Sequence, residues 1–201
     1  MIKLDSNGIN QHEPGALCSS MGLLSYTALV RIVEDGVINA PIENVNGSSI
    51  DITLDAEIML EDDPKFNSVV NLMTGESVEM RRHVMLDGFG YQMIPGEFVL
   101  GSTLEYFKLP LNISAEFKLK STLARNGLEH LAAGWIDPGF HGNLTLELIN
   151  TTKRHRLVIA PGMKIGQIVF FDHEQIPAEV EYAARGQYQG QRGVVVAGRL
   201  K

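Results

Sequence analysis

The chain has 201 residues, of which 44% are hydrophobic and 20% charged, values typical of one compact globular domain. Its formal net charge of −7, from 17 basic and 24 acidic residues, argues against a nucleic-acid backbone as the main partner, because proteins that bind nucleic acids usually present a basic face. Cys18 is the only cysteine, which excludes a disulfide within the chain and a cysteine-rich zinc site.

The sequence shows no sign of a secretion signal or a membrane span. The N-terminus lacks the basic, apolar and small-residue succession of a signal peptide. No apolar run approaches the ~20 residues that span a bilayer. We therefore expect a cytoplasmic protein, in a bacterial, archaeal or virus-infected cell, that binds neither membranes nor nucleic acids. A small anionic ligand stays compatible with the acidic charge, because a few convergent Lys and Arg residues, helped by a divalent cation, can hold a triphosphate.

The N-terminal part of the chain predicts one helix. Residues 1–22 have no clear periodicity and are interpreted as an N-terminal extension. Residues 23–34 (LLSYTALVRIVE) carry apolar positions at helical spacing and end at Asp35-Gly36, a typical helix stop.

Short strands separated by Gly and Pro follow the helix. The alternating run IDITLDAEIML predicts one strand over 50–60, and Thr74-Gly75-Glu76 predicts a hairpin-like turn. Pro95-Gly96-Glu97 separates YQM from FVLGSTLEYFKL, and NLTLELIN, HRLVIAP and KIGQIVFF add three more strands. Many short strands at close spacing predict a mainly β domain over 23–184, a barrel or a jelly roll with a few short helices. The Gly-rich segment 185–201 is either a mobile flap or a frayed terminus.

A single helical turn in the middle of the chain has the composition of an anion site. Residues 121–127 (STLARNG) begin with a hydroxyl residue and end with glycine, which predicts a capped turn. The turn can form a small anion-binding site from its free backbone N–H groups, two hydroxyls and two basic side chains. The hydroxyls belong to Ser121 and Thr122, and the basic side chains to Lys120 and Arg125. A capped helix with a solvated arginine is the alternative.

Two carboxylates stand in segments that otherwise resemble a protein interior. Asp137 begins the run DPGF, which predicts a turn between strands, and it is either an ordinary turn residue or a buried functional group. In NLTLELIN, alternation puts Leu144, Leu146 and Leu148 on one face and Glu147 on the other. If the leucines face the interior, Glu147 is only exposed. If its own face lines a cleft between subunits, the carboxylate can shuttle protons.

His130 and His141 are metal-ligand candidates by residue type. The pattern His-x-Glu followed by Cys-x-x-Cys, which is typical of zinc deaminases, does not occur in the sequence. No second histidine stands at metal-ligand spacing. We therefore expect no metal site built from these histidines.

Four separated motifs resemble the dCTP deaminases, which belong to the trimeric dUTPase superfamily: KSTLARNGL, HLAAGWIDPGFHGNLTLELIN, APGMKIGQ and EYAARGQYQGQRG. The segments NVNGSSIDITLDAEI and PGEFVLGSTLEYFKLP are also similar to the family, so the resemblance covers roughly residues 25–198 in order. It implies a distorted, dUTPase-like β-barrel or jelly roll that forms a homotrimer with nucleotide sites between subunits. It also implies an enzyme that converts dCTP to dUTP and ammonia without zinc, with Mg²⁺ accompanying the triphosphate.

The resemblance also assigns roles to residues. Glu147 would transfer protons, with Arg125 and Ser121 as the other catalytic residues that organise the water. Asp137 would bind the deoxyribose 3′-hydroxyl with Phe140 packed nearby. Lys120 and Thr122 would contact the phosphates, and Thr145 would lie on the strand that reads the pyrimidine. Tyr182, Gln187 and Gln191 would contact the nucleotide from the C-terminal tail, of which residues 185–201 would close over the site as a flap.

Some positions depart from the family pattern and others bear on the product. Lys120 replaces a usual Arg and Gln187 a common Lys, which weakens the expected hold on phosphate. Bifunctional members, which continue to dUMP and pyrophosphate, carry Ala-Gly-aromatic before Ile-Asp and a Gln after Pro-Gly-Met. Residues 133–135 and Gln167 match these patterns, and we count Gln167 among the nucleotide-site residues. We expect Gly134 to leave room beside Asp137 for a second, phosphate-directed water.

Two other functions on the same fold remain open. A dUTP pyrophosphatase would need no carboxylate facing C4, and its glycine-rich terminal motif is absent from the tail, so Glu147 argues against it. A non-catalytic nucleotide sensor could lose Glu147 freely, and the complete set of Ser121, Arg125, Asp137 and Glu147 argues against that. The leading prediction is a dCTP deaminase that supplies dUMP for thymidylate synthesis.

Overall fold

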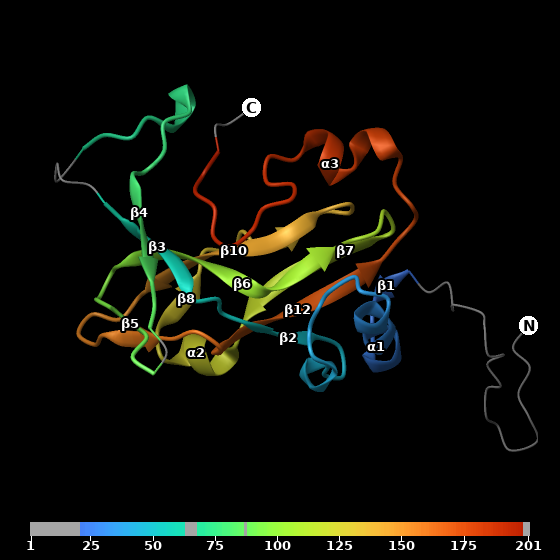
Figure 1. The fold of residues 1–201 in the computed structure, drawn as a ribbon, viewed down its shortest axis with the longest axis horizontal. Helices are drawn as coiled ribbons and strands as arrows, with labels where there is room; N and C mark the ends of the chain where they lie inside the picture. The colour runs from blue at the N-terminus through green and yellow to red at the C-terminus, as the bar shows by residue number, and fades with distance from the viewer. Residues whose placement is uncertain (1–20, 63–67, 87, 199–201) are drawn as a thin grey trace, which may run out of the picture.

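The computed structural model describes residues 21–62, 68–86 and 88–198, so nearly all of the expected N-terminal extension lies outside the described residues. The described chain forms two five-stranded antiparallel sheets and one two-stranded sheet (Figure 1). The first sheet contains β1 (Gly22–Leu23), β12 (Lys164–Asp172), β7 (Ile113–Leu119) and β9 (Trp135–Ile136), with β2 (Ile50–Thr53) also paired to β12. The second contains β4 (Met80–Val84), β3 (Glu57–Glu61), β6 (Phe98–Lys108), β10 (His141–Asn150) and β8 (Leu128–His130). The small sheet pairs β5 (Tyr91–Met93) with β11 (Leu157–Ile159).

The two large sheets share one apolar core. Its fully buried members come from both sheets, and they include Ile52, Ile168 and Phe170 from the first and Ile58, Phe107 and Leu148 from the second. This arrangement confirms the predicted mainly β fold with a few short helices. The described strands do not close into a barrel, because the two sheets stay separate and meet through an isolated bridge between Leu54 and Thr103.

The predicted helix is present, but it is shorter than expected. Helix α1 spans Tyr26–Glu34 and ends at Asp35 as predicted, with Leu29 and Ile32 buried. It begins three residues late because Gly22–Leu23 pair with β12 as strand β1. None of the helices in the described part of the chain is long and apolar enough to cross a membrane.

The prediction of one strand over 50–60 is wrong. The alternating run is divided between β2 and β3, which belong to different sheets. Between them the backbone N–H of Leu54 donates to Met163 O at 2.9 Å and that of Asp55 to Ser102 O at 2.9 Å, so the chain crosses from one sheet to the other. Periodicity alone could not show the crossing, because both strands alternate in the same sense.

The predicted turns are partly confirmed. Pro95–Glu97 separates β5 from β6, although β5 pairs with β11 and not with β6. The turn near Gly75 is a short 3-10 helix, η2 (Leu72–Thr74), and not a hairpin turn: β4 begins at Met80 and pairs with β3. The last strands, β10, β11 and β12, lie where the sequence predicts them.

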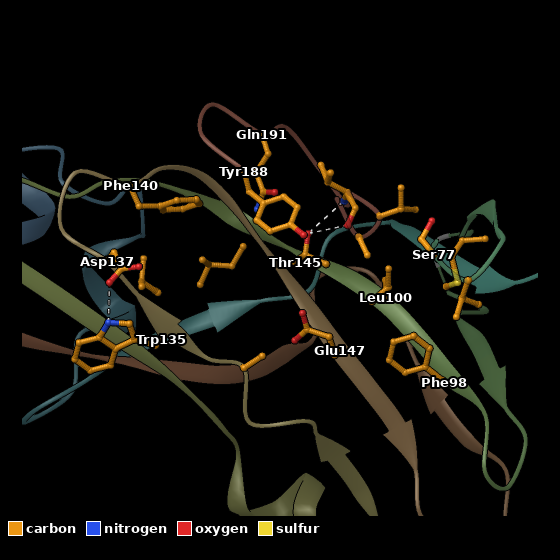
Figure 2. Close-up of a pocket in the computed structure, with 18 of the residues that line it drawn as sticks. Ser77, Phe98, Leu100, Trp135, Asp137, Phe140, Thr145, Glu147, Tyr188 and Gln191 are labelled. Atoms are coloured by element: carbon orange, nitrogen blue, oxygen red, sulfur yellow. Dashed lines mark hydrogen bonds between the residues drawn. The ribbon is translucent and has the colours of Figure 1, made fainter. Parts of the chain in front are cut away.

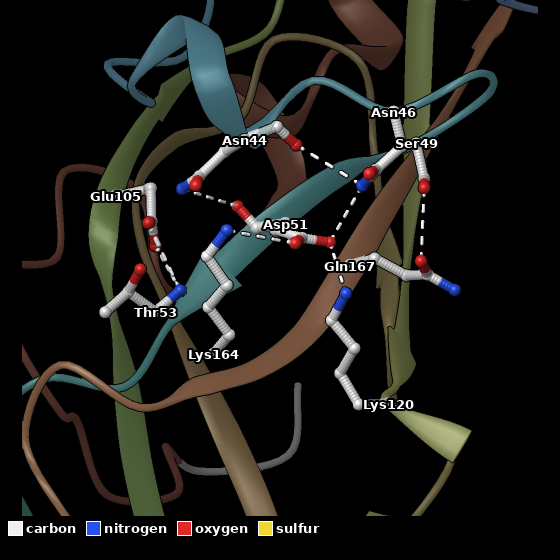
Figure 3. A network of polar contacts seen from close by, with 9 residues as sticks. All are labelled: Asn44, Asn46, Ser49, Asp51, Thr53, Glu105, Lys120, Lys164 and Gln167. Carbon is white, nitrogen blue, oxygen red and sulfur yellow. Dashed lines mark hydrogen bonds and ion pairs between the residues drawn. The ribbon is translucent and has the colours of Figure 1, made fainter. Parts of the chain in front are cut away.

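One buried carboxylate ties the first sheet to the helical turn α2 (Ser121–Arg125) (Figure 3). Asp51, on β2, is only 7% exposed. Its Oδ1 accepts hydrogen bonds from Lys120 Nζ at 2.5 Å and Asn46 Nδ2 at 2.8 Å, and its Oδ2 accepts one from Lys164 Nζ at 3.2 Å. Burial raises the pKa of Asp51, but these hydrogen bonds outweigh burial and hold it below its ordinary value.

A second buried carboxylate joins the two sheets. Glu105, on β6, accepts the backbone N–H of Thr53, on β2, with Oε1 at 3.1 Å and Oε2 at 2.9 Å (Figure 3). Burial raises the pKa of Glu105, although these bonds to Thr53 act in the opposite direction. Both carboxylates are therefore committed to the fold.

Asp51→Asn should lower the free energy of unfolding by about 2 kcal/mol at neutral pH, less than a fully buried pair because Lys164 is half exposed. The folded-state pKa is lowered, so the contribution of Asp51 is complete above the unfolded-state value of ~3.9 and is lost as the pH falls through the folded-state value. Urea unfolding near pH 7 and near pH 3.5 should show the difference between wild type and variant shrink at the lower pH.

The matched control is Asp62→Asn, which removes the carboxylate of an exposed ion pair with Arg81 at 3.9 Å. Its effect should stay below about 0.5 kcal/mol at both pH values. Equal losses in the two variants would contradict a structural role for the Asp51 network.

Candidate active site

A cleft of about 600 Å³ opens beside β10 and β6 (Figure 2). Glu147 and Thr145 project into it from β10, and Phe98 and Leu100 line it from β6. The rest of the wall comes from the segment between η2 and β4, from residues 133–140 and from the C-terminal part of the chain. It includes Ser77, Asp137, Phe140, Tyr182, Tyr188, Gln191 and Val195. Six of the expected nucleotide-site residues therefore share one cleft.

The turn that carries Asp137 forms as predicted. The backbone N–H of Phe140 donates to Asp137 O at 3.2 Å, and Gly139 has the positive φ of 80° that such a turn requires. Of the two alternatives for Asp137, a buried group is not found in this chain: the residue is exposed and lines the cleft. Its Oδ1 accepts a hydrogen bond from Trp135 Nε1 at 3.1 Å.

Phe140 is buried and anchors the same turn. It is 4% exposed, and its ring meets that of Tyr182 edge to face, with centroids 5.3 Å apart. Tyr182 begins helix α3 (Tyr182–Arg185), and burial raises the pKa of its hydroxyl. The contact joins the start of β10 to the C-terminal part of the chain.

A register shift in β10 decides which side chains enter the cleft. The pairing with β6 slips between Asn143 and Thr145. Leu146 and Leu148 are buried in the core, as the alternation predicts, whereas Leu144 lies beside the shift and lines the cleft. Glu147 lines a cleft of its own chain even though Leu146 and Leu148 face the core, so the two conditions set for Glu147 do not exclude each other.

Glu147 faces a histidine without being tied to it. His130 Nε2 and Glu147 Oε2 lie 3.3 Å apart, with side chains 5% and 27% exposed. The contact lacks hydrogen-bond geometry, so within the described residues both buried atoms have no hydrogen-bond partner. Glu147 Oε2 is thus buried against His130, while the side chain as a whole keeps 27% of its surface exposed on the cleft.

Residues 188–197 run along β10 above the cleft. The backbone N–H of Asn143 donates to Gln191 O at 3.2 Å. In return, Gln191 Nε2 donates to Asn143 O at 2.5 Å. The N–H of Val195 donates to Thr145 Oγ1 at 3.2 Å. Gln187 lines a second cleft, of about 830 Å³, which adjoins the first at Trp135, Asp137, Tyr182 and Tyr188.

The expected phosphate residues lie elsewhere. Ser121, Thr122 and Arg125 are exposed on α2, which Figure 1 shows on the side of the sheets opposite α3. They do not line the 600 Å³ cleft or the 830 Å³ cleft. The expected hydroxyl cap of α2 is wrong: Lys120 occupies the N-cap position, without a side-chain cap. The Lys120 ammonium is held by Asp51.

Gln167 also lies outside both clefts. Its Oε1 accepts a hydrogen bond from Ser49 Oγ at 3.1 Å in the network around Asp51 (Figure 3). Gly134 does not make room beside Asp137, contrary to expectation: a Cβ at this position would lie 2.8 Å from Phe117 O, so the glycine lets β9 approach β7.

No group of three His, Cys, Asp or Glu side chains that could hold a metal ion occurs within residues 21–62, 68–86 and 88–198. The sequence did not predict the other residues that line the cleft, among them Tyr188 and Val195, nor the contact of Trp135 with Asp137. The run VVVA at 194–197 was the available signal, because an apolar run is unusual in an otherwise polar tail.

A model of the dCTP deaminase-like family matches residues 23–173. The chain is 39% identical over 155 residues to a Corynebacterium glutamicum protein named dCTP deaminase, dUMP-forming. This match covers 75% of the chain and 80% of the relative. It is 44% identical over 154 residues to a Beutenbergia cavernae protein of the same name, covering 74% of this chain and 78% of that one.

The fold is similar to the crystal structure of 2′-deoxycytidine 5′-triphosphate deaminase from Agrobacterium tumefaciens, with a TM-score of 0.60 at 18% identity. That match covers 76% of this chain and 48% of the other, so this chain spans about half the length of that structure. The family model and the relatives agree with the motifs in the sequence. The chain belongs to the dCTP deaminase-like family of enzymes.

Proposed function

We propose that the chain removes the C4 amino group of dCTP as ammonia and then hydrolyses the product to dUMP and pyrophosphate. The observation that carries the proposal is Glu147: it projects from β10 into the cleft and keeps 27% of its side-chain surface exposed, while its Oε2 lies buried against His130. The relatives named dUMP-forming dCTP deaminases support both steps.

Glu147 would serve in turn as base and acid. Deamination requires that a water lose a proton as it attacks C4, and that N3 and the departing ammonia gain protons. One carboxylate can do both, and such a proton-transfer group contributes roughly 10²–10⁴ in rate. The half-buried position of Glu147 favours this role, because the carboxylate is reachable from the cleft and yet shielded from bulk water.

The same cleft offers groups for the rest of the nucleoside. Asp137, exposed at the rim, would accept a hydrogen bond from the deoxyribose 3′-hydroxyl, and Phe140 and Tyr182 form an aromatic wall beside it. Thr145 would lie against the pyrimidine. Gln187 and Gln191 belong to a C-terminal segment that we propose closes over the base and the phosphates.

The phosphates would be held by a neighbouring subunit. Ser121, Thr122 and Arg125 are exposed on α2 and lie outside the cleft of their own chain. In a homotrimer with heterologous contacts, α2 of one subunit can face the cleft of the next. Because Lys120 is paired with Asp51, we propose that Lys120 orients α2 and that Arg125 is the phosphate-binding cation of the turn.

Mg²⁺ would enter the site with the nucleotide. The described residues offer no cluster of carboxylates and histidines for an all-protein cage, and Mg²⁺ commonly binds through substrate phosphates and water. When bound, the ion would neutralise charge on the triphosphate. Ser121, Thr122 and Arg125 would contact oxygens of the same triphosphate.

Glu147→Gln should lower the rate of ammonia release from dCTP by about 10²–10⁴, because the amide keeps the size of the side chain but cannot exchange protons. The dissociation constant for dCTP should change by no more than about threefold, since the amide still fills the cleft. A coupled ammonia assay and calorimetry would measure the two quantities.

Glu129→Gln is the matched control, because Glu129 is an exposed carboxylate on the adjacent strand β8. It should release ammonia at the wild-type rate. Near-wild-type ammonia release by Glu147→Gln would remove Glu147 from the mechanism.

The shared site predicts complementation between two inactive variants. Glu147→Gln damages the cleft and Arg125→Ala damages α2, so a mixed trimer can contain an interface at which both parts are intact. Random mixing in equal amounts should restore about a quarter of the wild-type rate. Separately purified homotrimers, mixed without unfolding, are the control. No recovery after refolding together, with trimers formed, would show that each site lies within one chain.

The product can be followed directly. Incubation of dCTP with enzyme and Mg²⁺, followed by chromatography over time, should show dUMP and pyrophosphate, and added dUTP should also be hydrolysed. Accumulation of dUTP as the sole product, with added dUTP left intact, would show that the reaction ends at deamination.

A further inference from the structure

Trp135 is an exposed aromatic residue that is nevertheless held in place. It is 57% exposed at the start of β9, which pairs with β7 through Glu116 and Trp135. Its ring stacks on Phe171 of β12, with centroids 6.0 Å apart and planes 27° apart. Its Nε1–H donates a hydrogen bond to Asp137 Oδ1 at 3.1 Å, which Figure 2 shows as a dashed line.

The backbone before Trp135 is also fixed. The N–H of Phe117 donates to Gly134 O at 2.8 Å, and a Cβ at Gly134 would lie 2.8 Å from Phe117 O. The next residue, Ile136, pairs with Ala115 and is buried in the core. Both ends of the short strand are therefore held against β7, so the backbone that carries the indole is fixed.

Trp135 and Asp137 stand where the two clefts meet, because both residues line both clefts. A carboxylate has two oxygens that accept hydrogen bonds, and an indole can only donate one. Within the described residues the Asp137 side chain makes only the bond from Trp135 through Oδ1. Oδ2 is therefore open to a donor, and a hydroxyl group is a donor of the right kind.

We propose that Trp135 is a positioning residue that sets the specificity of the site for a sugar with a free 3′-hydroxyl. The inference rests on the proposed function, which puts the deoxyribose at Asp137. An unrestrained, exposed carboxylate has to lose rotational freedom when it binds the hydroxyl, whereas the indole bond has already removed that freedom. Phenylalanine at position 135 could stack on Phe171 but could not orient Asp137.

The test combines two variants with two nucleotides. Trp135→Phe removes the N–H donor and keeps an aromatic ring for stacking, whereas Phe171→Leu removes the stacking partner and keeps the donor. The nucleotides are dCTP and 2′,3′-dideoxycytidine triphosphate, which lacks the 3′-hydroxyl. Ammonia release gives kcat and KM, and calorimetry gives the dissociation constants.

In the wild type, loss of the 3′-hydroxyl should weaken binding about tenfold, as expected for a hydrogen bond to a charged group. Trp135→Phe should raise KM for dCTP about three- to tenfold with kcat within about twofold, and the preference for dCTP should fall to about twofold. Phe171→Leu should keep the wild-type preference. A merely structural role for Trp135 would weaken both nucleotides equally, and an unchanged preference in Trp135→Phe would overturn the inference.

A second measurement does not depend on turnover. Trp135 is the only tryptophan among the 201 residues, so the intrinsic tryptophan fluorescence of the wild type reports this site alone. Addition of dCTP should change the fluorescence at lower concentration than addition of the dideoxy nucleotide. If dCTP changes the fluorescence at lower concentration than the dideoxy nucleotide but no ammonia is released, the proposed deamination is refuted. The role of Trp135 in recognising the 3′-hydroxyl is then supported. Equal response to both nucleotides, with deamination intact, would refute the inference alone.

Discussion

The register shift between β10 and β6 is the constraint on which the candidate site depends. Side chains alternate along a strand, so a slip of one position exchanges the faces. The shift is held in place by Asn143, which is 8% exposed and whose Nδ2 donates to Thr103 O and Glu105 O at 3.0 Å each. After the shift, Leu146 and Leu148 enter the core while Thr145 and Glu147 face the cleft.

Four carboxylates differ in role because their surroundings differ: two stabilise the fold and two face a cleft. Asp51 and Glu105 are buried, and backbone or lysine donors satisfy them fully enough to bind strands together. Asp137 and Glu147 lie at the rim and the wall of a cleft and keep oxygens without partners in the described residues. A satisfied buried carboxylate stabilises the fold because its hydrogen bonds replace those to water, and it is no longer available to a ligand.

The separation of α2 from the cleft follows from the way each element is anchored. Helix α2 begins at Lys120, which Asp51 holds to the first sheet, whereas the cleft forms on β10 and β6 of the second sheet. In the proposed site, α2 and the cleft are the two halves, and one chain cannot bring them together without breaking its own core. In the proposed homotrimer every copy would supply one half to its neighbour.

The sequence by itself determined the mainly β class, the positions of most strands and turns, the family, and the residues Glu147, Asp137, Phe140, Thr145, Tyr182 and Gln191 that share the cleft. These features depend on local residue patterns and on motifs, both of which can be recognised in the sequence. Only the tertiary structure decided which face of β10 lines the cleft, because the register shift depends on pairing with a strand some 40 positions away. It alone placed Lys120 and Gln167 in the Asp51 network and linked Trp135 to Asp137, because such contacts depend on how separate strands pack and on which donors remain when the core has formed.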